Sequence, residues 1–205
     1  MLSYNILKPM PYEFRFSIAH HVHFHALLES CQCSANKANG TQCGRTVVIG
    51  TDLCWTHLLQ IKHLRILPST VPNIGKGLFA LDKKRPANTI IFKKNDLIAS
   101  YIGETLTTAE LIARYGDHTA PYCMEVKNNT YEDCALIRSY CSIANRAPTA
   151  QAKNSRFITN FHMHPQRVQL KATKNIYNGD EIFTSYGNKY RMNDGSDHAT
   201  VQVRR

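Results

Sequence analysis

The chain lacks several features that define large classes of proteins. No apolar run approaches the ~18–20 residues needed to span a bilayer. The first nine residues lack the basic and apolar regions of a secretory signal. The sequence also has no internal repeat and no low-complexity segment. These absences argue against a membrane, secreted or repeat protein, and predict a soluble intracellular one that does not contact membranes.

The composition is that of a chain that can bury a core. The 205 residues are 43% hydrophobic and 20% charged, which suits one ordinary domain with a small appendage. The formal net charge is +10. This excess fits an acidic partner such as nucleic acid, or a merely solubilising surface. Its basic residues are scattered in short groups, and no single run forms a basic arm; the groups are Lys83-Lys84-Arg85, Lys93-Lys94, Lys171, Lys174 and Arg204-Arg205.

Seven cysteines in a chain expected inside the cell indicate metal or thiol chemistry before disulfides. Cys33, Cys43, Cys54 and His57 follow the spacing C-x9-C-x10-C-x2-H. Three thiolates and an imidazole would form a closed structural Zn²⁺ site with no open position for catalysis. Cys31 competes with Cys33 as a ligand, and buried free thiols are the alternative for the whole group. Such a site would hold together a region too short for its own core.

Local patterns predict a β-rich chain with little helix. One helix is expected over residues 55–67, where apolar residues recur at helical spacing before Pro68. A second is expected over residues 107–115, with Thr107 as its cap and Glu110 three residues later. Short strands are expected over residues 77–80, 89–92, 97–101, 122–126, 167–172 and 181–185.

Four short motifs occur in a fixed order along this β-rich part. They are residues 73–80 (NIGKGLFA), 100–104 (SYIGE), 142–146 (SIANR) and 178–187 (NGDEIFTSYG). Each is weak alone, since a G-x-G turn or a Tyr-Gly strand end is common. Together, over about residues 72–191, the set resembles the SET domain of protein-lysine methyltransferases. The resemblance implies a fold of small β-sheets in which a C-terminal segment is threaded through a loop, an exception to the usual un-knotted chain.

The resemblance also implies a cofactor, S-adenosylmethionine, and roles for particular residues. The backbone of Gly75-Lys76-Gly77 resembles the turn that holds the amino-acid end of the cofactor. Tyr101 resembles the tyrosine of the strand that follows, and Asn145-Arg146 occupies the place of the family's Asn-His pair beside the cofactor. Tyr186 resembles the tyrosine beside the transferring methyl group.

A narrow channel for the substrate lysine is implied on the other face of the domain. Tyr122 resembles the aromatic residue that lines this channel, with a catalytic role beside that of Tyr186. Phe183, Thr184 and Tyr190 are the other channel residues. Thr184 stands where many relatives carry Phe or Tyr, and its small side chain favours the addition of more than one methyl group.

The sequence departs from the family pattern at three points, and these argue against assigning the family's methyltransferase activity to it directly. Arg146 replaces the usual histidine, and Ser142 lies where an arginine is usual. No cysteine follows Tyr190, so the zinc-binding segment found after some SET domains is missing. The alternatives to an active enzyme are therefore a degenerate SET domain that binds chromatin or protein, and a zinc module that binds nucleic acid.

These arguments divide the chain into three parts. Residues 1–67 form an N-terminal region with the zinc module at about 31–57 and a helix, residues 68–192 form the SET-like domain, and residues 193–205 form a tail. The expected partners are a protein with a target lysine, such as a histone or a nucleosome, and nucleic acid through the positive charge. This function favours the nucleus over the cytoplasm.

Overall fold

A computed structural model describes residues 30–48, 50–116, 120, 122–160 and 167–187, and gives the backbone alone of 13–18 and 22–27. Tyr190 and the tail at 193–205 lie outside these ranges. The strands are β1 (Glu13–Ile18), β2 (Val22–Leu27), β3 (Ser30–Gln32), β4 (Thr46–Val48), β5 (Leu64–Pro68), β6 (Lys76–Ala80), β7 (Ile90–Phe92), β8 (Leu97–Tyr101), β9 (Glu104–Thr107), β10 (Cys123–Lys127), β11 (Thr130–Asp133), β12 (Asn145–Arg146), β13 (Ser155–Asn160), β14 (Arg167–Ala172), β15 (Ile176–Tyr177) and β16 (Phe183–Thr184). The helices are α1 (Trp55–Lys62), α2 (Thr108–Tyr115) and a 3-10 turn at Tyr140–Ile143.

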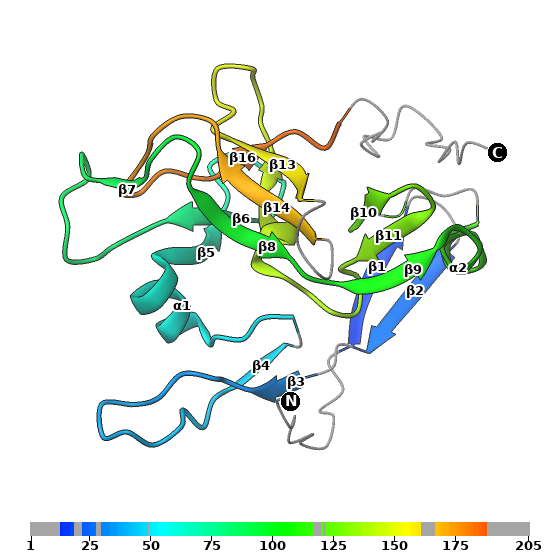
Figure 1. Cartoon of the computed structure of the whole chain (residues 1–205), viewed down its shortest axis with the longest axis horizontal. Coiled ribbons are helices and arrows are strands. Elements are labelled where there is room, and N and C mark those ends of the chain that lie inside the picture. Colours follow the sequence, from blue (N-terminus) through cyan, green and yellow to red (C-terminus); the bar gives the residue numbers. More distant parts are fainter. Residues whose placement is uncertain are drawn as a thin grey trace.

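The strands form several small sheets, and none in the described ranges has more than three strands (Figure 1). One three-stranded sheet has the order β13-β14-β8, and the other has the order β10-β11-β9. The remaining pairs are β1-β2, β3-β4, β5-β6, β7-β15 and β12-β16. The predicted mainly β fold with few short helices is confirmed.

The main core is one cluster of buried side chains from the sheet β13-β14-β8, the pair β5-β6 and the C-terminal part. Leu64 of β5, Leu78 of β6 and Leu170 of β14 are fully buried, and Ile176 and Ile182 join them from the C-terminal part. Their aliphatic side chains leave water together, and each such burial is worth roughly 1.5–3 kcal/mol. This cluster joins residues of β5, β6, β8 and β14, although β5 and β14 are far apart in the sequence.

The C-terminal segment runs between the two ends of one loop. On one side β16 pairs in parallel with β12, and the amide of Ala147 donates to the carbonyl of Thr184 at 2.9 Å. On the other side the amide of Phe183 donates to the side chain of Asn154 at 2.8 Å, and Ser155 Oγ donates to the Phe183 carbonyl at 2.8 Å. The segment is thus bracketed by the loop that joins β12 to β13, as expected of a threaded segment.

Helix α2 begins as the sequence predicts. The side chain of Thr107 accepts a hydrogen bond from the amide of Glu110, and the Glu110 carboxylate accepts one from the amide of Thr107 at 2.7 Å. This capping box satisfies two backbone donors that a helix leaves unpaired at its start.

Helix α1 is shorter than predicted. It ends at Lys62, where His63 takes a left-handed conformation with φ of 53°, and residues Leu64–Pro68 form β5 instead. The prediction of one helix over 55–67 is wrong because Leu64 and Leu67 pair with β6, with Leu64 opposite Ala80. Apolar residues at helical spacing cannot reveal a partner strand that comes later in the chain.

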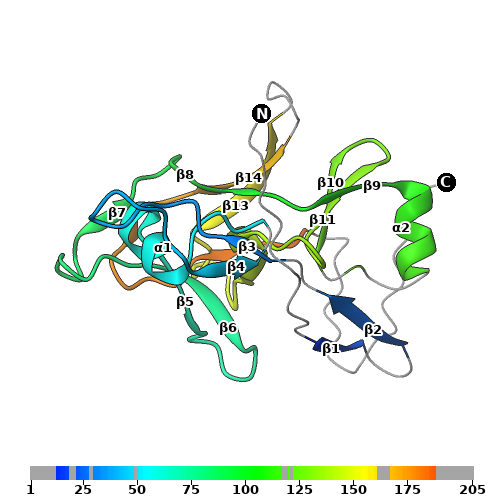
Figure 2. The same ribbon diagram turned by 90° about the horizontal axis from the view of Figure 1, so that it is seen from below.

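The N-terminal module and the SET-like part share one core. Cys33, Cys54 and Leu58 belong to the same cluster of buried residues as Leu78 and Leu170. Figure 1 shows β3 and β4 at the lower side of the molecule, on the same side as α1, and Figure 2 looks onto this side. Within the described ranges, no helix is long and apolar enough to cross a membrane.

Candidate functional site

Asn145 joins two of the motifs. Its side-chain nitrogen Nδ2 donates to the carbonyl of Lys76 in the G-x-G turn at 2.9 Å, and to Glu181 Oε1 at 3.0 Å. Asn145 lies in β12, which pairs with β16. The structure therefore brings together Gly75-Lys76-Gly77 and Asn145, the two groups that the resemblance assigns to the cofactor.

Glu181 is the centre of this arrangement. The residue is 5% exposed, and its carboxylate accepts four hydrogen bonds. Besides Asn145, the donors are Ser69 Oγ at 2.8 Å, the Thr70 amide at 2.7 Å and Thr70 Oγ1 at 2.6 Å. Burial by itself would raise the pKa of Glu181, but the hydrogen bonds from Thr70, Asn145 and Ser69 outweigh it and hold the pKa below its ordinary value. The carboxylate is thus an anion that fixes the strand pair β5-β6 to the C-terminal segment.

Gly75 and Gly77 serve this turn in different ways. Gly75 has φ of 82°, a conformation that favours glycine, and a side chain built there would meet open space. A side chain at Gly77 would collide with the Glu181 carboxylate. Gly75 and Lys76 are both exposed, so a ligand can reach the backbone of the turn.

Tyr186 lies next to the same strand. Its hydroxyl donates to the carbonyl of Ala144 at 3.1 Å, directly before Asn145, and the residue is half-buried. Tyr186 is therefore tied to the element that carries Asn145. Its part in catalysis is proposed below.

The predicted channel residues of β16 are both buried. Phe183 is 8% exposed and is held by Asn154 and Ser155 through its backbone. Thr184 is fully buried, and its Oγ1 has no hydrogen-bond partner among the described residues. Tyr190 lies outside the described residues. Whether these residues line a lysine channel stays a prediction.

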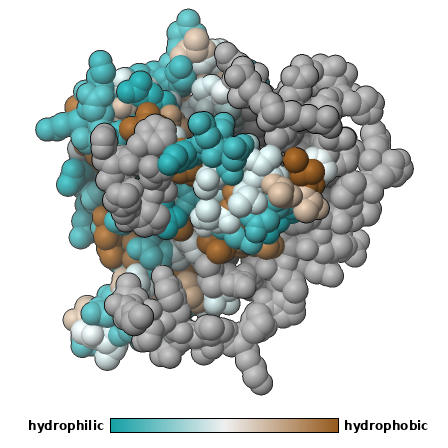
Figure 3. Space-filling view, turned by 45° about the vertical axis from the view of Figure 1, so that its right-hand side comes forward, coloured by the Kyte–Doolittle hydropathy of each residue, from teal (hydrophilic) through white to brown (hydrophobic). Residues whose placement is uncertain are grey.

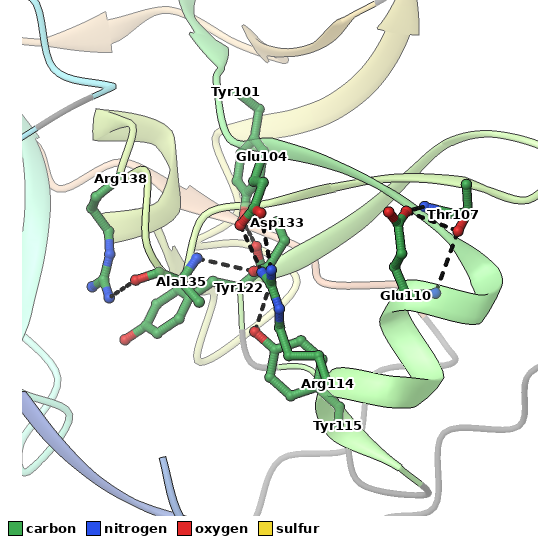
Figure 4. A network of polar contacts seen from close by, with 10 residues as sticks. All are labelled: Tyr101, Glu104, Thr107, Glu110, Arg114, Tyr115, Tyr122, Asp133, Ala135 and Arg138. Atoms are coloured by element: carbon green, nitrogen blue, oxygen red, sulfur yellow. Dashed lines mark hydrogen bonds and ion pairs between the residues drawn. The ribbon is translucent and has the colours of Figure 1, made fainter. Parts of the chain in front are cut away.

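Tyr101 and Tyr122 form a second group, drawn in Figure 4. Tyr101 is 3% exposed, and its hydroxyl donates to the carbonyl of Tyr122 at 2.7 Å. The guanidinium of Arg138 lies 4.1 Å from the centre of the Tyr122 ring, a cation–π contact. Burial raises the pKa of Tyr101 well above its ordinary value, so its hydroxyl stays a donor. The structure shows Tyr101 fixing the backbone of Tyr122, while its contact with a cofactor stays a prediction.

A buried ion pair anchors helix α2 beside this group (Figure 4). Asp133 is fully buried and accepts hydrogen bonds from Arg114 at 2.9 Å, Tyr115 at 2.7 Å and the Ala135 amide at 2.9 Å. Arg114 also forms a bidentate pair with Glu104 at 2.8 and 3.0 Å. These bonds hold β11, and through it the Tyr122 region, in a fixed position relative to α2.

Arg146 and Ser142, the two residues that depart from the family pattern, make no contact with other described residues that suggests a function. Arg146 is exposed at the end of β12. Ser142 lies in the 3-10 turn, and its hydroxyl donates to the Ser139 carbonyl at 2.7 Å. Neither observation assigns either residue a role with a cofactor.

The four predicted metal ligands lie together. The ligand atoms of Cys33, Cys43, Cys54 and His57 are all within 4.8 Å of one another. His57 Nδ1 is 3.4 Å from both Cys33 Sγ and Cys54 Sγ. Three sulfurs and one nitrogen at these separations fit a tetrahedral Zn²⁺, whose Zn–S bonds are about 2.3 Å long. Cys31 lies in β3 outside this cluster, so Cys33 is the candidate ligand.

Local backbone structure explains this arrangement. The amide of Cys33 donates to the Arg45 carbonyl at 2.9 Å, and the amide of Cys43 donates to the Ala35 carbonyl at 2.8 Å. Gly40 makes the turn between them with φ of 80°. Cys54 caps helix α1 and His57 lies in its first turn, so both side chains point the same way.

The surroundings of Cys54 prepare its thiol for a metal, whereas burial raises the pKa of the Cys33 thiol. Burial would raise the pKa of Cys54, but hydrogen bonds from the amides of His57 and Thr56 and from neighbouring side chains lower it to about 6. A thiolate is the form that binds metal. By contrast, burial raises the pKa of Cys123 and Cys141, and raises the pKa of Cys134 to about 11, so these three thiols stay protonated at neutral pH.

Sequence reasoning missed three residues of the Asn145 group. They are Ser69, Thr70 and Glu181. Glu181 lies within the motif at residues 178–187, but the sequence predicted only that it belongs to a strand. A charged residue in an apolar strand was the available signal, since such residues are almost never buried without partners. Ser69 and Thr70 carried no local signal.

Comparison with known proteins supports the fold. No family model matches the chain, and no curated protein matches it. Solved structures do match. They include Chaetomium thermophilum Polycomb Repressive Complex 2 bound to S-adenosylmethionine in an autoinhibited conformation, with 21% identity and a TM-score of 0.50 over 63% of this chain. The same complex with H3K27me3 and H3K27M matches with 21% identity and a TM-score of 0.51 over 66% of this chain.

These neighbours are SET-domain proteins, and the chain accordingly has the SET-domain fold. A humanized mutant of the Chaetomium complex bound to the inhibitor GSK126 matches in the same way, with 22% identity and a TM-score of 0.50 over 63% of this chain. The chain spans only 15–16% of the length of these solved chains. At this level of identity the likeness defines the fold alone.

Proposed function

We propose that this chain is an S-adenosylmethionine-dependent protein-lysine N-methyltransferase. The single observation that carries the proposal is the position of Asn145. Its side chain bonds to the G-x-G turn and to Glu181, while the carbonyl just before it receives the Tyr186 hydroxyl. Hydrogen bonds thus join motifs that are separate in the sequence, which supports one common site.

The residues present fit the cofactor. Gly75 and Lys76 offer an exposed backbone with open space beside Gly75, which suits a zwitterionic amino-acid group. These two residues and Asn145 would hold S-adenosylmethionine. When bound, it would supply a methyl group on a positively charged sulfur.

The chain's own residues would prepare the lysine. A lysine amine has a reference pKa of about 10.4, so presenting it neutral at pH 7 costs about 4–5 kcal/mol. Apolar and aromatic surroundings lower this cost because they disfavour the ammonium form. Buried Phe183 and half-buried Tyr122 would supply them. The Tyr186 hydroxyl, which donates to the Ala144 carbonyl, would accept a hydrogen bond from the amine and align it.

The substrate is proposed to be a protein, with a histone as the first candidate. In support, one matched structure holds the Chaetomium complex with H3K27me3 and H3K27M. Fold does not define a target, so the assignment needs a direct assay. The Cys/His cluster would be a structural zinc site, because its four ligands leave no open position.

The test is methyl transfer from labelled S-adenosylmethionine to histones, nucleosomes and proteins of a cell extract. We expect labelling of at least one protein, and a loss of about 10²-fold or more with Tyr186→Phe, because misplacement of a reacting group costs about that much. Tyr177→Phe, at an exposed tyrosine, is the control and should keep full activity. Unchanged transfer by Tyr186→Phe would refute the role of Tyr186.

A second function is favoured by Arg146 at the family's histidine position. In this alternative the SET fold binds a protein without methylating it. Calorimetry with S-adenosylmethionine separates the two. If S-adenosylmethionine binds but no histone, nucleosome or extract protein is methylated, the protein-binding function would be favoured.

A further inference from the structure

Basic residues that are scattered in the sequence gather at one end of the fold. They come from three segments: the loop after β7, the loop before β13, and strands β13 and β14 with the turn that follows. The six residues are Lys93, Lys94, Lys153, Arg156, Lys171 and Lys174, here called the basic end. All are exposed except Lys171, which is half-buried.

Backbone hydrogen bonds define this convergence. The amide of Asn95 donates to the Ala172 carbonyl at 2.9 Å, and the amide of Thr173 donates to the Asn154 carbonyl at 2.8 Å. The Lys94 amide donates to Asn175 Oδ1 at 3.0 Å. Residues 93–96, 151–154 and 171–175 are therefore direct neighbours, and the loops that follow β7 and β14 run together in Figure 1.

The segments that form the basic end contain few acidic residues that could neutralise its positive charge. Within the described ranges, none of the six residues forms an ion pair. Asp96 is the acidic residue in these segments, and its carboxylate accepts a hydrogen bond from the backbone amide of Lys93 at 2.8 Å. Hydrophilic residues make up much of the left-hand edge of Figure 3, in keeping with a polar surface.

One pair in the basic end works against stability. Arg156 and Lys171 stand directly opposite each other in the antiparallel pair β13-β14. Like charges at such positions repel and destabilise the sheet. A bound polyanion would relieve this repulsion. The pair is therefore better explained by binding of an anion than by stability of the fold.

We propose that the basic end is a binding surface for the phosphate backbone of duplex nucleic acid. Five of its six residues are lysines, whose flexible point charges suit sequence-independent contacts with phosphates. The chain as a whole carries +10, which would steer it towards such a polyanion. Acidic proteins and anionic membranes are the competing occupants.

The surface also adjoins the candidate site. Lys153 directly precedes Asn154, whose side chain donates to the Glu181 carbonyl at 2.8 Å and accepts from the Phe183 amide at 2.8 Å. Nucleic acid held at the basic end would therefore lie near the segment that leads to Tyr186. This surface does not depend on the proposed methyl transfer.

The test compares two sets of three charge reversals. Lys93→Glu, Lys94→Glu and Lys153→Glu together alter the basic end, while Lys37→Glu, Lys62→Glu and Lys127→Glu together alter exposed lysines elsewhere. Binding to a short labelled DNA duplex is followed by fluorescence anisotropy at several salt concentrations, without methyl donor. The first set should weaken binding at least about tenfold and lower the slope of log K against log salt by about 3.

A second variant separates binding from folding. Arg156→Gln with Lys171→Gln should leave the melting temperature unchanged or raise it, yet weaken binding to DNA. A lower melting temperature with unchanged binding would overturn the proposal.

Three other results would also overturn it. One is unchanged binding by the first set. Another is an equal or larger loss by the control set, which would place the surface at the zinc module, where Arg45 and Arg65 lie over the exposed ring of Trp55. The last is binding of the wild type to vesicles of anionic lipid but not to DNA. Methyl transfer to a free protein is measured separately, so either proposal can fail alone.

Discussion

The carboxylate of Glu181 occupies the place that a side chain at Gly77 would need. The two residues lie in β6 and just before β16, in motifs that are about a hundred positions apart in the sequence. Because four hydrogen bonds hold Glu181, it cannot move aside at little cost. The position of Glu181 thus requires a glycine at residue 77, whether or not a cofactor binds there.

Gly77→Ala is expected to destabilise the protein by about 1–3 kcal/mol, the usual cost of overpacking a filled site. The added methyl group would displace Glu181 and break its bonds with Ser69 and Asn145. Denaturant unfolding measures the effect. Gly44→Ala is the matched control, since a side chain there meets open space, and it should change stability by less than about 0.5 kcal/mol. Equal effects of the two changes would contradict the packing argument.

The ionised form of Glu181 should stabilise the fold at neutral pH. Its folded-state pKa is lowered, so its contribution is present above the unfolded pKa of about 4.3 and is lost as pH falls through the folded value. Glu181→Gln should therefore lower the free energy of unfolding at pH 7 and flatten its decline on acidification. Unfolding in urea between pH 7 and pH 3 measures both. A decline as steep as that of the wild type would show that another carboxylate is responsible.

Removal of metal should destabilise the whole chain, because Cys33 and Cys54 belong to the common core. We expect about one zinc per chain in the purified protein, and a lower melting temperature after chelation. Cys43→Ser should reduce the zinc content, whereas Cys31→Ser, outside the cluster, should not. Elemental analysis is the measurement. Full zinc content in Cys43→Ser would exclude the assigned ligand set.

Arg114→Met should cost about 3–5 kcal/mol of stability, because it leaves the buried charge of Asp133 without its cationic partner. Thermal and denaturant unfolding test this. Arg156→Met, at an exposed arginine in β13, removes the same charge and should have an effect within about 0.5 kcal/mol. If both substitutions cost the same, Arg114 does not act through Asp133.

Tyr140→Phe should weaken the attachment of the N-terminal module. The Tyr140 hydroxyl donates to Asp52 Oδ1 at 2.5 Å and accepts from the Leu53 amide at 2.9 Å, across the junction with the SET-fold part. A loss of about 1.5–3 kcal/mol is expected for a bond to a charged group. Hydrogen exchange should show faster exchange of the Leu53 amide. Unchanged protection there would mean that the junction is held by packing alone.

Much of the local structure could be predicted from the sequence. The bounds of β8 and β14 match the expected ranges, and the capping box at Thr107 and Glu110 is present. These features depend on residues that are close in the sequence. The Cys/His cluster was also predictable, because Cys54 and His57 share one turn of helix and Gly40 marks the turn before Cys43.

Other features could not be predicted because they depend on distant partners. Helix α1 stops early since β5 pairs with β6. Glu181 was not predicted to be a central residue because its partner Ser69 is 112 positions away. The six basic residues of the basic end gave no continuous run, and only the pairing of loops and strands brings them together.

By itself the sequence determined the kind of fold, through an ordered set of short motifs, and the members of the Cys/His cluster that could hold a metal, through spacing within a single module. Tertiary structure alone decided that Asn145 joins the G-x-G turn to Glu181, and that scattered positive charge becomes one surface. The physical reason is that hydrogen bonds and charge repulsion act over a few ångströms in space. A linear pattern cannot show which distant residues come that close.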